Sequence, residues 1–321
     1  MSRRRPRRIL DESLDDHPAV LAWRAVEPRG EVPQRIEVYC ESPNWLLYSL
    51  RGAGPNGSTV FAKRRLMSMA ATERAVYERI LPSLPIATPR CFGCVDEDAY
   101  VWLLIEAIDG APYDEGDPEH LAIAGDCVAA MHTSAVSLVH STSLPEAGPE
   151  RYLAHLTAGR ETLEKCLHTS QAFDSAGRKI VERTVETLNR VEACWPAIRG
   201  RCQDAPITLV HADFRPKNVF VRRDGAGCVA FDWETAGWGP PAADLTKIDV
   251  IAYWRAAREL WGTLSLETVQ GWERIGYLFQ LLAAIDWKGT ELGVDSTEAL
   301  ATPLFSLDLM GTRLADVSAT L

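Results

Sequence analysis

The feature that most constrains the fold is a run of eight residues, His211-Ala-Asp-Phe-Arg-Pro-Lys-Asn218, which precedes a hairpin that ends at Asp232. A hairpin returns its two ends to neighbouring positions, so the Asn218 amide and the Asp232 carboxylate can face one ion. Asp213 adds a second carboxylate within the same run. Phosphoryl transfer from a nucleotide requires such a set, because one carboxylate orients and deprotonates the attacking hydroxyl while an amide and a carboxylate hold magnesium.

The pattern His-x-Asp-x-x-x-x-Asn followed by Asp is shared with protein kinases, but this stretch resembles the aminoglycoside phosphotransferase and choline kinase family. Only eight residues, 235–242, separate the Asp-Trp-Glu segment from the next expected helix, which leaves no long activation segment. The segment Gly239–Leu245 is similar to the small-molecule kinase pattern, in which Asp244 would anchor the start of a helix. The resemblance implies an α+β, protein-kinase-like bilobal fold with a small antiparallel β-sheet lobe and a larger, mostly helical lobe.

The apolar pattern of the chain agrees with that layout. Period-two alternation and turn residues predict strands at 35–39, 45–50, 59–63, 90–95 and 100–106. Helical spacing predicts helices at 68–81, 120–138, 149–165 and 179–198, short strands at 207–210, 219–222 and 229–231, and further helices after 242. We therefore expect a basic flexible tail (1–16), a β-rich nucleotide lobe (17–106), a hinge (107–110) and a helical lobe with the catalytic loop and substrate site (111–321).

The charge of the chain bears on its choice of partner. The net charge of −10 disfavours nucleic acid, because neutralising phosphates takes clustered Lys and Arg, and it mildly favours a cationic substrate.

The arginine run 2–8 is followed at once by acidic residues rather than by the apolar run of a signal peptide. No stretch approaches the roughly 18 apolar residues of a membrane span, and the scattered cysteines predict free thiols and a cytoplasmic location. The oligomeric state is left open.

Two residues are candidates for catalysis. Asp213 is the candidate base, which would accept the hydrogen bond of the substrate hydroxyl and aim its oxygen at the γ-phosphorus. An Asp after a strand is also a common turn former, but the complete octapeptide favours the catalytic role. Protein kinases keep a lysine where this chain has Arg215, so Arg215 would offset charge on the transferring group or would be only a solvated loop arginine. The resemblance implies an architectural role for His211.

The candidate magnesium ligands are Asn218 and Asp232, because magnesium prefers hard oxygen donors. Glu234 would point to the same side as Asp232 if the segment is extended. It would then hold a metal-bound water, or it would be only a surface acid, and both interpretations stay open.

The co-substrate expected from the resemblance is ATP, with GTP as the alternative. Lys63 closes an alternating strand where the family places its phosphate lysine, and Glu73 resembles the helix glutamate that pairs with it, with Glu78 as a rival. The residues Glu106, Ala107 and Ile108 would offer backbone groups to the purine edge.

The loop that covers the phosphates is the weakest part of the resemblance. Protein kinases use a glycine-rich loop, whereas the first turn here is Glu41-Ser-Pro-Asn-Trp45. Ser42 and Asn44 are the candidates for hydroxyl or backbone donors to the phosphates.

The predicted function is a small-molecule kinase that uses magnesium and a nucleoside triphosphate to phosphorylate a hydroxyl group. The resemblance and the acidic balance favour an aminoglycoside or another cationic antibiotic as substrate. Acidic residues are available for this in the expected helical lobe: Asp114, Glu115, Asp117, Asp286, Glu291 and Asp295. A metabolic kinase for choline, homoserine or a sugar is the close alternative, and a non-catalytic binding protein that kept the fold is the second.

Overall fold

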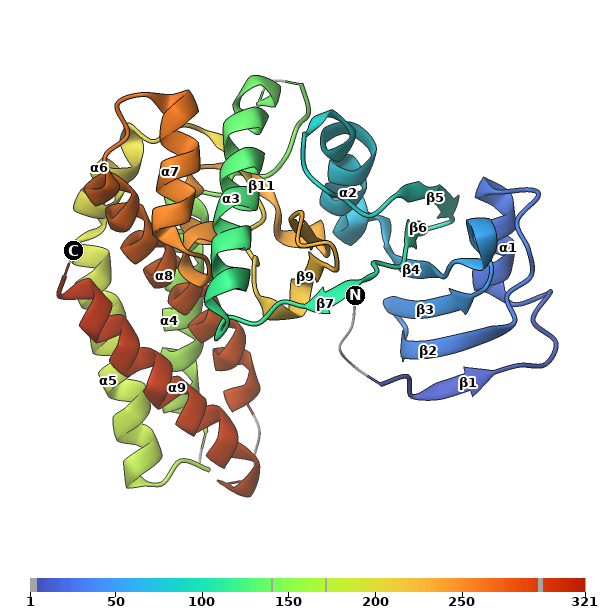
Figure 1. Ribbon diagram of the computed structural model, residues 1–321. Coiled ribbons are helices and arrows are strands. Elements are labelled where there is room, and N and C mark those ends of the chain that lie inside the picture. Colours follow the sequence, from blue (N-terminus) through green and yellow to red (C-terminus); the bar gives the residue numbers. More distant parts are fainter. Residues whose placement is uncertain (1–4, 140, 171, 294–296, 321) are drawn as a thin grey trace. The chain divides into compact units, whose positions relative to one another are not determined.

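The structure is a computed structural model that describes residues 5–139, 141–170, 172–293 and 297–320 (Figure 1). The chain divides into two compact units. The first unit consists of residues 1–145, 211–237 and 247–261, and the second of residues 146–210, 238–246 and 262–321. Each unit is therefore assembled from segments that are distant in the sequence, and the candidate catalytic and nucleotide-binding residues all belong to the first.

The first unit contains a six-stranded antiparallel sheet with strand order β1-β2-β3-β4-β6-β5. Its strands are β1 (Arg8–Leu10), β2 (Arg35–Ser42), β3 (Trp45–Arg51), β4 (Val60–Leu66), β5 (Cys91–Glu97) and β6 (Tyr100–Glu106). The five predicted strands are confirmed as β2 to β6. The edge strand β1 is a difference, because Arg8–Leu10 fall within the expected flexible tail but pair with Ile36–Val38 of β2.

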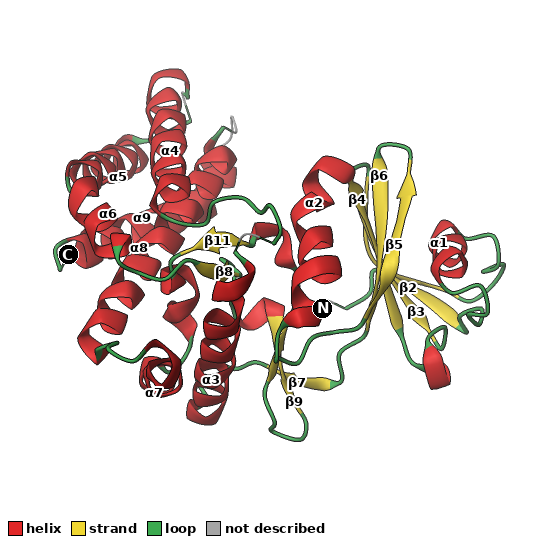
Figure 2. Ribbon diagram, turned by 90° about the horizontal axis from the view of Figure 1, so that it is seen from above, coloured by secondary structure: helices red, strands yellow, loops and turns green. Residues whose placement is uncertain are grey.

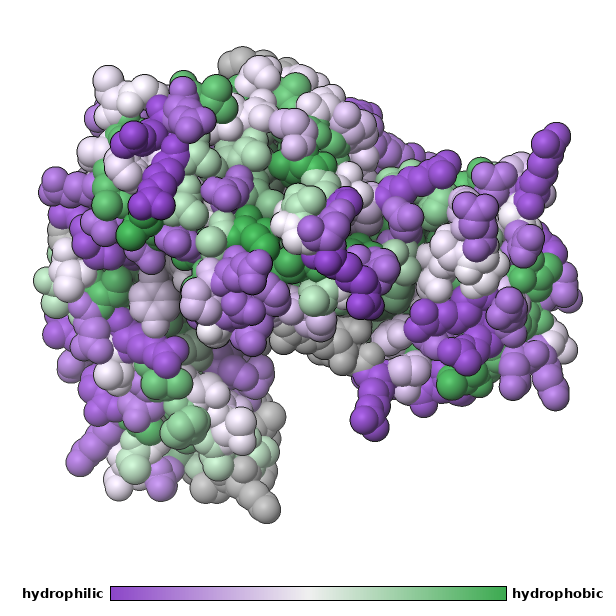
Figure 3. Space-filling model, in the orientation of Figure 1, coloured by the Kyte–Doolittle hydropathy of each residue, from purple (hydrophilic) through white to green (hydrophobic). Residues whose placement is uncertain are grey.

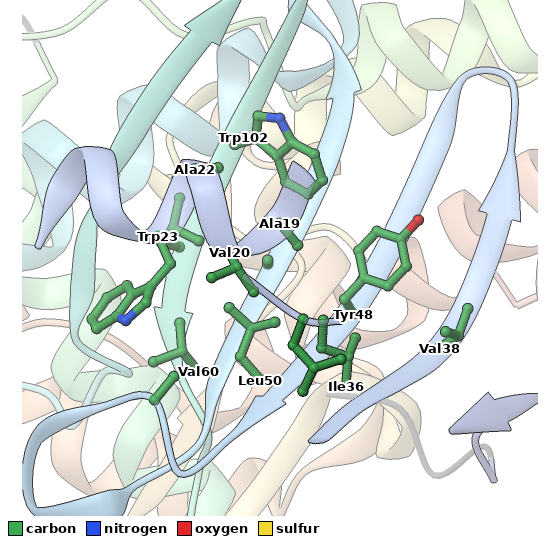
Figure 4. Close-up of a cluster of buried hydrophobic side chains, with 14 residues drawn as sticks. Ala19, Val20, Ala22, Trp23, Ile36, Val38, Tyr48, Leu50, Val60 and Trp102 are labelled. Carbon is green, nitrogen blue, oxygen red and sulfur yellow. The ribbon is translucent and has the colours of Figure 1, made fainter. Parts of the chain in front are cut away.

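Two helices cover the sheet, α1 (Pro18–Val26) on one side and α2 (Met67–Ala75) on the other (Figure 2). The apolar side chains Val20 and Trp23 of α1 pack against Leu50, Val60 and Trp102 of the sheet (Figure 4). The predicted helix 68–81 is confirmed as α2 and the π-helical turn Val76–Ile80 that follows it. Because side chains alternate along β4, the residues that do not face α1 point to the opposite side, which includes Lys63.

A second, three-stranded antiparallel sheet carries the motif region. Its strands, in the order β10-β9-β7, are β7 (Gly110–Pro112), β9 (Val219–Arg222) and β10 (Cys228–Ala230). The predicted hairpin is confirmed, since Val219 pairs with Ala230 and Val221 with Cys228. No strand was expected at β7, which begins at the last residue of the expected hinge. It forms because its backbone hydrogen-bonds to β9, although Gly110–Pro112 shows no β pattern of its own.

The first unit also contains α3 (Pro118–Ala135), which packs against α7 (Val250–Trp261). Among the described residues, one helical stretch, Pro118–Leu138, is long and apolar enough to cross a membrane by length and composition, contrary to the sequence expectation. Its Val128 and Met131 side chains are buried in the unit, and a Cβ at Gly125 would lie 2.6 Å from the carbonyl of Asp249, which directly precedes α7. Gly125 therefore allows the backbones of α3 and the start of α7 to approach closely.

The second unit is helical apart from a two-stranded sheet of β8 (Thr208–Val210) and β11 (Gly237–Gly239). Its helices are α4 (Pro149–Thr169), α5 (Ser175–Ala193), α6 (Trp195–Gln203), α8 (Leu266–Gly289) and α9 (Thr297–Ser318). The single predicted helix 179–198 is two helices, because the chain turns at Cys194 and Pro196 opens α6. The sheet and the helical majority together confirm the α+β class.

The surface of the sheet region is largely polar. Figure 3 shows mainly hydrophilic side chains over β1, β2 and β3, with scattered apolar ones between them. The apolar contacts of this region therefore lie inside, between α1 and the sheet.

Candidate active site

A buried histidine links the loop that contains the candidate base Asp213 to the segment that precedes Asp232. His211 Nδ1 accepts from the Asp213 backbone N–H at 3.3 Å, and His211 Nε2 donates to the Phe231 carbonyl at 3.0 Å. The His211 side chain is completely buried. The architectural role predicted for His211 is confirmed, because one imidazole joins the backbones on both sides of the β9–β10 hairpin.

Three donors fix the carboxylate of Asp213, which is nearly buried. Asn218 Nδ2 donates to Asp213 Oδ2 at 2.7 Å, and Lys217 Nζ lies 2.8 Å from the same oxygen. Arg215 forms an ion pair with the other carboxylate oxygen. The structure therefore brings Arg215, Lys217 and Asn218 around the candidate base, and each contact restricts the direction in which that base can accept a proton.

Asn218 and Asp232 line one cavity of about 460 Å³ in the first unit. The Asn218 amide nitrogen also donates to the Asp213 carbonyl at 3.0 Å, so the amide is oriented with its oxygen as the remaining ligand atom. No three or more His, Cys, Asp or Glu side chains of the described chain form a metal-binding group. The donor set of Asn218 and Asp232 fits magnesium, which usually takes one or two protein oxygens and completes its shell with phosphate and water.

Lys63 enters the same cavity and is buried between two carboxylates. Its Nζ lies 2.8 Å from Glu73 Oε2 and 2.5 Å from Asp232 Oδ1. Burial by itself lowers the pKa of Lys63, but the charges of Glu73 and Asp232 outweigh it and raise the pKa above its ordinary value. Burial raises the pKa of Asp232, and Lys63 reverses this to a net lowering. Both groups are therefore charged at neutral pH.

The partner of Lys63 is settled by these contacts. Glu73 is the predicted partner, and it lies on α2 with almost no exposed surface. The rival Glu78 instead accepts from Arg74 at 3.1 Å, one turn earlier in the chain.

Of the two interpretations of Glu234, a free surface acid is not what the structure shows, and a role in holding a metal-bound water stays a prediction. Glu234 forms an ion pair with Arg65, and both side chains line the cavity. Sequence reasoning did not single out Arg65. The available signal was its place two residues after Lys63 in an alternating strand, which puts both side chains on one face of β4.

The structure does not bring Ser42 and Asn44 into the cavity. The Ser42 hydroxyl donates to the Trp45 carbonyl at 3.0 Å within the turn, and Asn44 is exposed at its tip. The cavity wall on this side is made instead by Tyr39, Cys40, Trp45 and Leu47. Backbone pairing of Ser42 with Trp45 closes the turn so tightly that its polar side chains point away.

The residues expected at the purine edge line a second cavity of about 380 Å³ in the first unit, together with residues of the β9–β10 hairpin. Two of their three backbone N–H groups are already used: Glu106 donates to the Arg90 carbonyl at 2.8 Å, and Ala107 donates to the Thr59 carbonyl at 3.0 Å. Among the described residues, the Ile108 N–H donates to no backbone acceptor. Of the three residues predicted at the purine edge, Ile108 is therefore the one whose backbone N–H makes no backbone hydrogen bond within the described chain.

The acidic residues expected near a substrate cleft have structural partners. In the first unit, Asp117 caps α3 through the Glu119 N–H at 2.9 Å, and Glu115 pairs with Lys247 at 2.9 Å. In the second unit, Asp286 lies 2.7 Å from His155 Nδ1. The remaining members are Asp114, which accepts from the Gly116 N–H at 2.9 Å, Glu291, which pairs with Lys288 at 2.8 Å, and Asp295, which lies outside the described residues.

Comparison with solved structures identifies the fold. An aminoglycoside 2′-phosphotransferase IIIa in its GDP complex has a TM-score of 0.62 at 13% identity and covers 91% of this chain and 96% of its own. Choline kinase from Cryptosporidium parvum Iowa II has a TM-score of 0.58 at 10% identity, with 88% and 90% covered. Macrolide 2′-phosphotransferase from Brachybacterium faecium has a TM-score of 0.52 at 16% identity, with 92% and 97% covered. The fold is therefore that of the kinase-like small-molecule phosphotransferases.

The sequence itself shows the family. A family model described as the phosphotransferase enzyme family matches residues 59–284, which is more than half of the chain. The chain belongs to this family. Comparison with curated protein sequences gives no match.

Proposed function

We propose that this protein is a kinase that transfers the γ-phosphate of ATP or GTP to a hydroxyl group of a small molecule in the cytoplasm. One observation carries the proposal: Asn218 and Asp232 line a single cavity with Lys63, and the Asn218 amide is hydrogen-bonded to Asp213. A candidate base, two candidate metal ligands and a phosphate-binding cation thus form one connected set, which is the set that phosphoryl transfer uses.

Each residue has a role in the proposed reaction. The substrate oxygen forms a bond to the γ-phosphorus, the bond from that phosphorus to the nucleoside diphosphate breaks, and the Asp213 carboxylate takes the hydroxyl proton. Lys63, held by Glu73, would bind the α- and β-phosphates. Asn218 and Asp232 would hold a magnesium ion, which supplies neutralising charge to the phosphates when bound. Arg215 would offset charge on the transferring group.

We propose a cationic antibiotic, most favourably an aminoglycoside, as the acceptor. The net charge of −10 supports this, as does the similarity to solved structures of an aminoglycoside and a macrolide phosphotransferase. The similarity to a choline kinase over 88% of the chain favours a metabolic acceptor instead. The third possibility, a non-catalytic binding protein, is favoured only by the position of Ser42 and Asn44 outside the cavity.

A screen of nucleotide consumption separates these three functions. Wild-type protein is incubated with ATP or GTP, magnesium and either a panel of antibiotics or a panel of hydroxyl metabolites, with Asp213→Ala as the matched control. Turnover with an antibiotic that the control lacks supports the proposal. Turnover only with metabolites rejects the antibiotic acceptor, and nucleotide binding without turnover in either panel rejects the kinase.

A further inference from the structure

Arg65 repeats the arrangement of Lys63 one step further along the cavity. Both side chains leave the same face of β4, about 6.6 Å apart along the strand, and both line the cavity of about 460 Å³. Lys63 pairs with Asp232, and Arg65 pairs with Glu234, two residues later in both segments. The Arg65 side chain is only 14% exposed. The cavity therefore contains two parallel cation–carboxylate pairs, and the proposed reaction assigns a role to one of them.

Two buried N–H groups beside this second pair have no acceptor. Arg65 Nε and the indole Nε1 of Trp45 are both buried and make no hydrogen bond to any described residue. Trp45 lies opposite Arg65 in the pairing of β3 with β4, and Arg65 Cζ is 6.0 Å from the indole ring. An unsatisfied buried donor costs about 1–3 kcal/mol. An anionic ligand that supplied oxygen acceptors here would remove that cost.

These donors lie beside the turn between β2 and β3, which is the expected position of a glycine-rich loop. In protein kinases that loop covers the nucleotide phosphates. The corresponding turn here, between β2 and β3, has no glycine, and the Ser42 hydroxyl is used inside it. Trp45 is the first residue after that turn, and Arg65 is its partner on β4. The side-chain donors of Trp45 and Arg65 therefore lie next to the turn, at the place where a glycine-rich loop would supply backbone N–H donors.

The charges in the cavity allow an exchange of partners. The lining includes three cationic side chains, Lys63, Arg65 and Lys217, and three carboxylates, Glu73, Asp232 and Glu234. These charges balance, so the cavity has no net attraction for a polyphosphate until an added cation is shared among the carboxylates. A guanidinium is well suited to move from a carboxylate to a phosphate, because its forked donors match both.

We propose that Arg65, together with the indole N–H of Trp45, binds the terminal phosphates of the nucleotide, and that Glu234 positions Arg65 before the nucleotide binds. The inference rests on the proposed function and extends it to a phosphate-binding residue outside the motif region. It makes Arg65 specific for the phosphates beyond the first, because Arg65 lies on the side of Lys63 that is nearer the β2–β3 turn.

The test compares Arg65→Gln with the neighbouring Arg64→Gln. Arg64 is on the opposite face of β4, where its Nε lies 2.5 Å from Glu97 and its Cζ is 3.7 Å from the Tyr100 ring centroid. Binding of ATP and of AMP, each with magnesium, is measured by titration calorimetry. Arg65→Gln is expected to weaken ATP binding by about 10- to 100-fold, the effect of a lost charge-assisted hydrogen bond, and AMP binding by less than about 2-fold. Arg64→Gln is expected to leave both unchanged.

The outcomes separate this inference from the proposed function. ATP affinity that is equal in Arg65→Gln and wild type, or an equal loss for AMP, overturns the role of Arg65 and leaves the kinase untouched. A wild-type protein that binds neither nucleotide contradicts the proposed function and this inference together. If Arg65→Gln does not fold, Arg65→Lys and Trp45→Phe take its place, and unchanged ATP affinity in both overturns the inference.

Discussion

At Ala212 and Asp232 the backbone adopts left-handed conformations, with φ of 61° and 69°. Both conformations position side chains of the candidate site. The backbone at Ala212 sets the direction of the next side chain, Asp213, and the backbone at Asp232 directs its own carboxylate toward Lys63. Asp visits this conformation readily, but Ala does so at a cost of roughly 1–2 kcal/mol. The chain therefore carries backbone strain at Ala212.

Ala212→Gly is expected to raise the free energy of unfolding by about 0.5–1 kcal/mol, since the relief of left-handed strain exceeds the extra entropy that glycine loses on folding. Thermal or denaturant unfolding measures the change. The matched control is Ala154→Gly, an exposed position within α4, which should lower stability by about 1 kcal/mol. A loss of stability in both variants would show that the loop is not strained at Ala212.

Glu37 provides a pH dependence at the same scale. Its carboxylate is buried on β2 and accepts from Arg51 at 2.8 Å and Tyr39 at 3.0 Å. Burial by itself raises the pKa of Glu37, but these hydrogen bonds and the nearby arginines outweigh it and lower the pKa below its ordinary value. A carboxylate with a lowered folded-state pKa stabilises the protein fully above its unfolded-state pKa of about 4.3, and this contribution is lost as the pH falls through the folded-state value.

Glu37→Gln should therefore reduce the free energy of unfolding by about 1–3 kcal/mol at pH 7, and the difference from wild type should shrink as the pH falls below about 4. Denaturant unfolding at pH 7 and pH 3 measures both differences. The exposed Glu182→Gln serves as control and should show little difference at either pH. An undiminished gap at pH 3 would mean that the stabilisation does not depend on the charge of Glu37.

At the scale of elements, the close approach of one helix to the backbone of a neighbouring segment depends on a glycine at the point of contact. In the second unit, α8 lies against the helical turn Pro241–Lys247, and a Cβ on Gly276 would overlap the Ala242 carbonyl. Gln280, one turn further along α8, donates to the Ala243 carbonyl at 3.1 Å. Gly271 on the same helix has nothing within 4 Å of such a Cβ. A side chain at Gly276 would therefore clash with the backbone of residues 241–247, whereas Gly271 has room for one.

Gly276→Ala should destabilise the protein by about 1–3 kcal/mol, the usual cost of forcing extra volume into a packed contact. Gly271→Ala, in the same helix and with the same chemical change, should stabilise it by about 0.5–1 kcal/mol. Equilibrium unfolding of the two variants is the measurement. Equal effects from both would contradict the close contact between α8 and residues 241–247.

The sequence allowed prediction of the elements that have a local residue pattern. It did not allow prediction of those that form only through contacts between distant segments. The hairpin after residues 211–218 was predictable because Asp213, Asn218 and Asp232 are joined by one short segment of regular pattern. The Arg65–Glu234 pair was not, because it joins β4 to the segment after the hairpin and exists only once the unit is folded. The strand β1 was missed because three residues are too few to show alternation.

The short helix α1 was also not predicted, although signals for a helix are present in its sequence. His17 caps it by accepting from the Ala19 N–H at 3.2 Å, and Pro18 occupies its first turn, where proline is favoured. The failure for Ser42 and Asn44 has another cause: residue type indicated donors to phosphate, but only the fold decides which way a turn presents its side chains.

At the scale of the whole molecule, residues from three separate stretches of the chain combine in the first unit. Residues 1–145 supply Lys63 and Glu73, residues 211–237 supply the candidate base and the candidate metal ligands, and residues 247–261 supply α7, which packs on α3. The site thus depends on one folded unit rather than on one local segment. The proposed function requires that Asp213 activate a hydroxyl of a separate acceptor for attack on a bound nucleotide.

Mass spectrometry of the acceptors tests this claim most directly. Candidate acceptors are incubated with ATP, magnesium and either wild-type protein or Asp213→Asn, and ATP affinity is measured on the same samples. The account predicts that wild-type protein adds one phosphoryl group to an acceptor, and that Asp213→Asn does so about 10²-fold more slowly or worse with ATP affinity nearly unchanged. Phosphorylation at equal rates by both proteins, or binding of ATP with no acceptor phosphorylated by either, would contradict it.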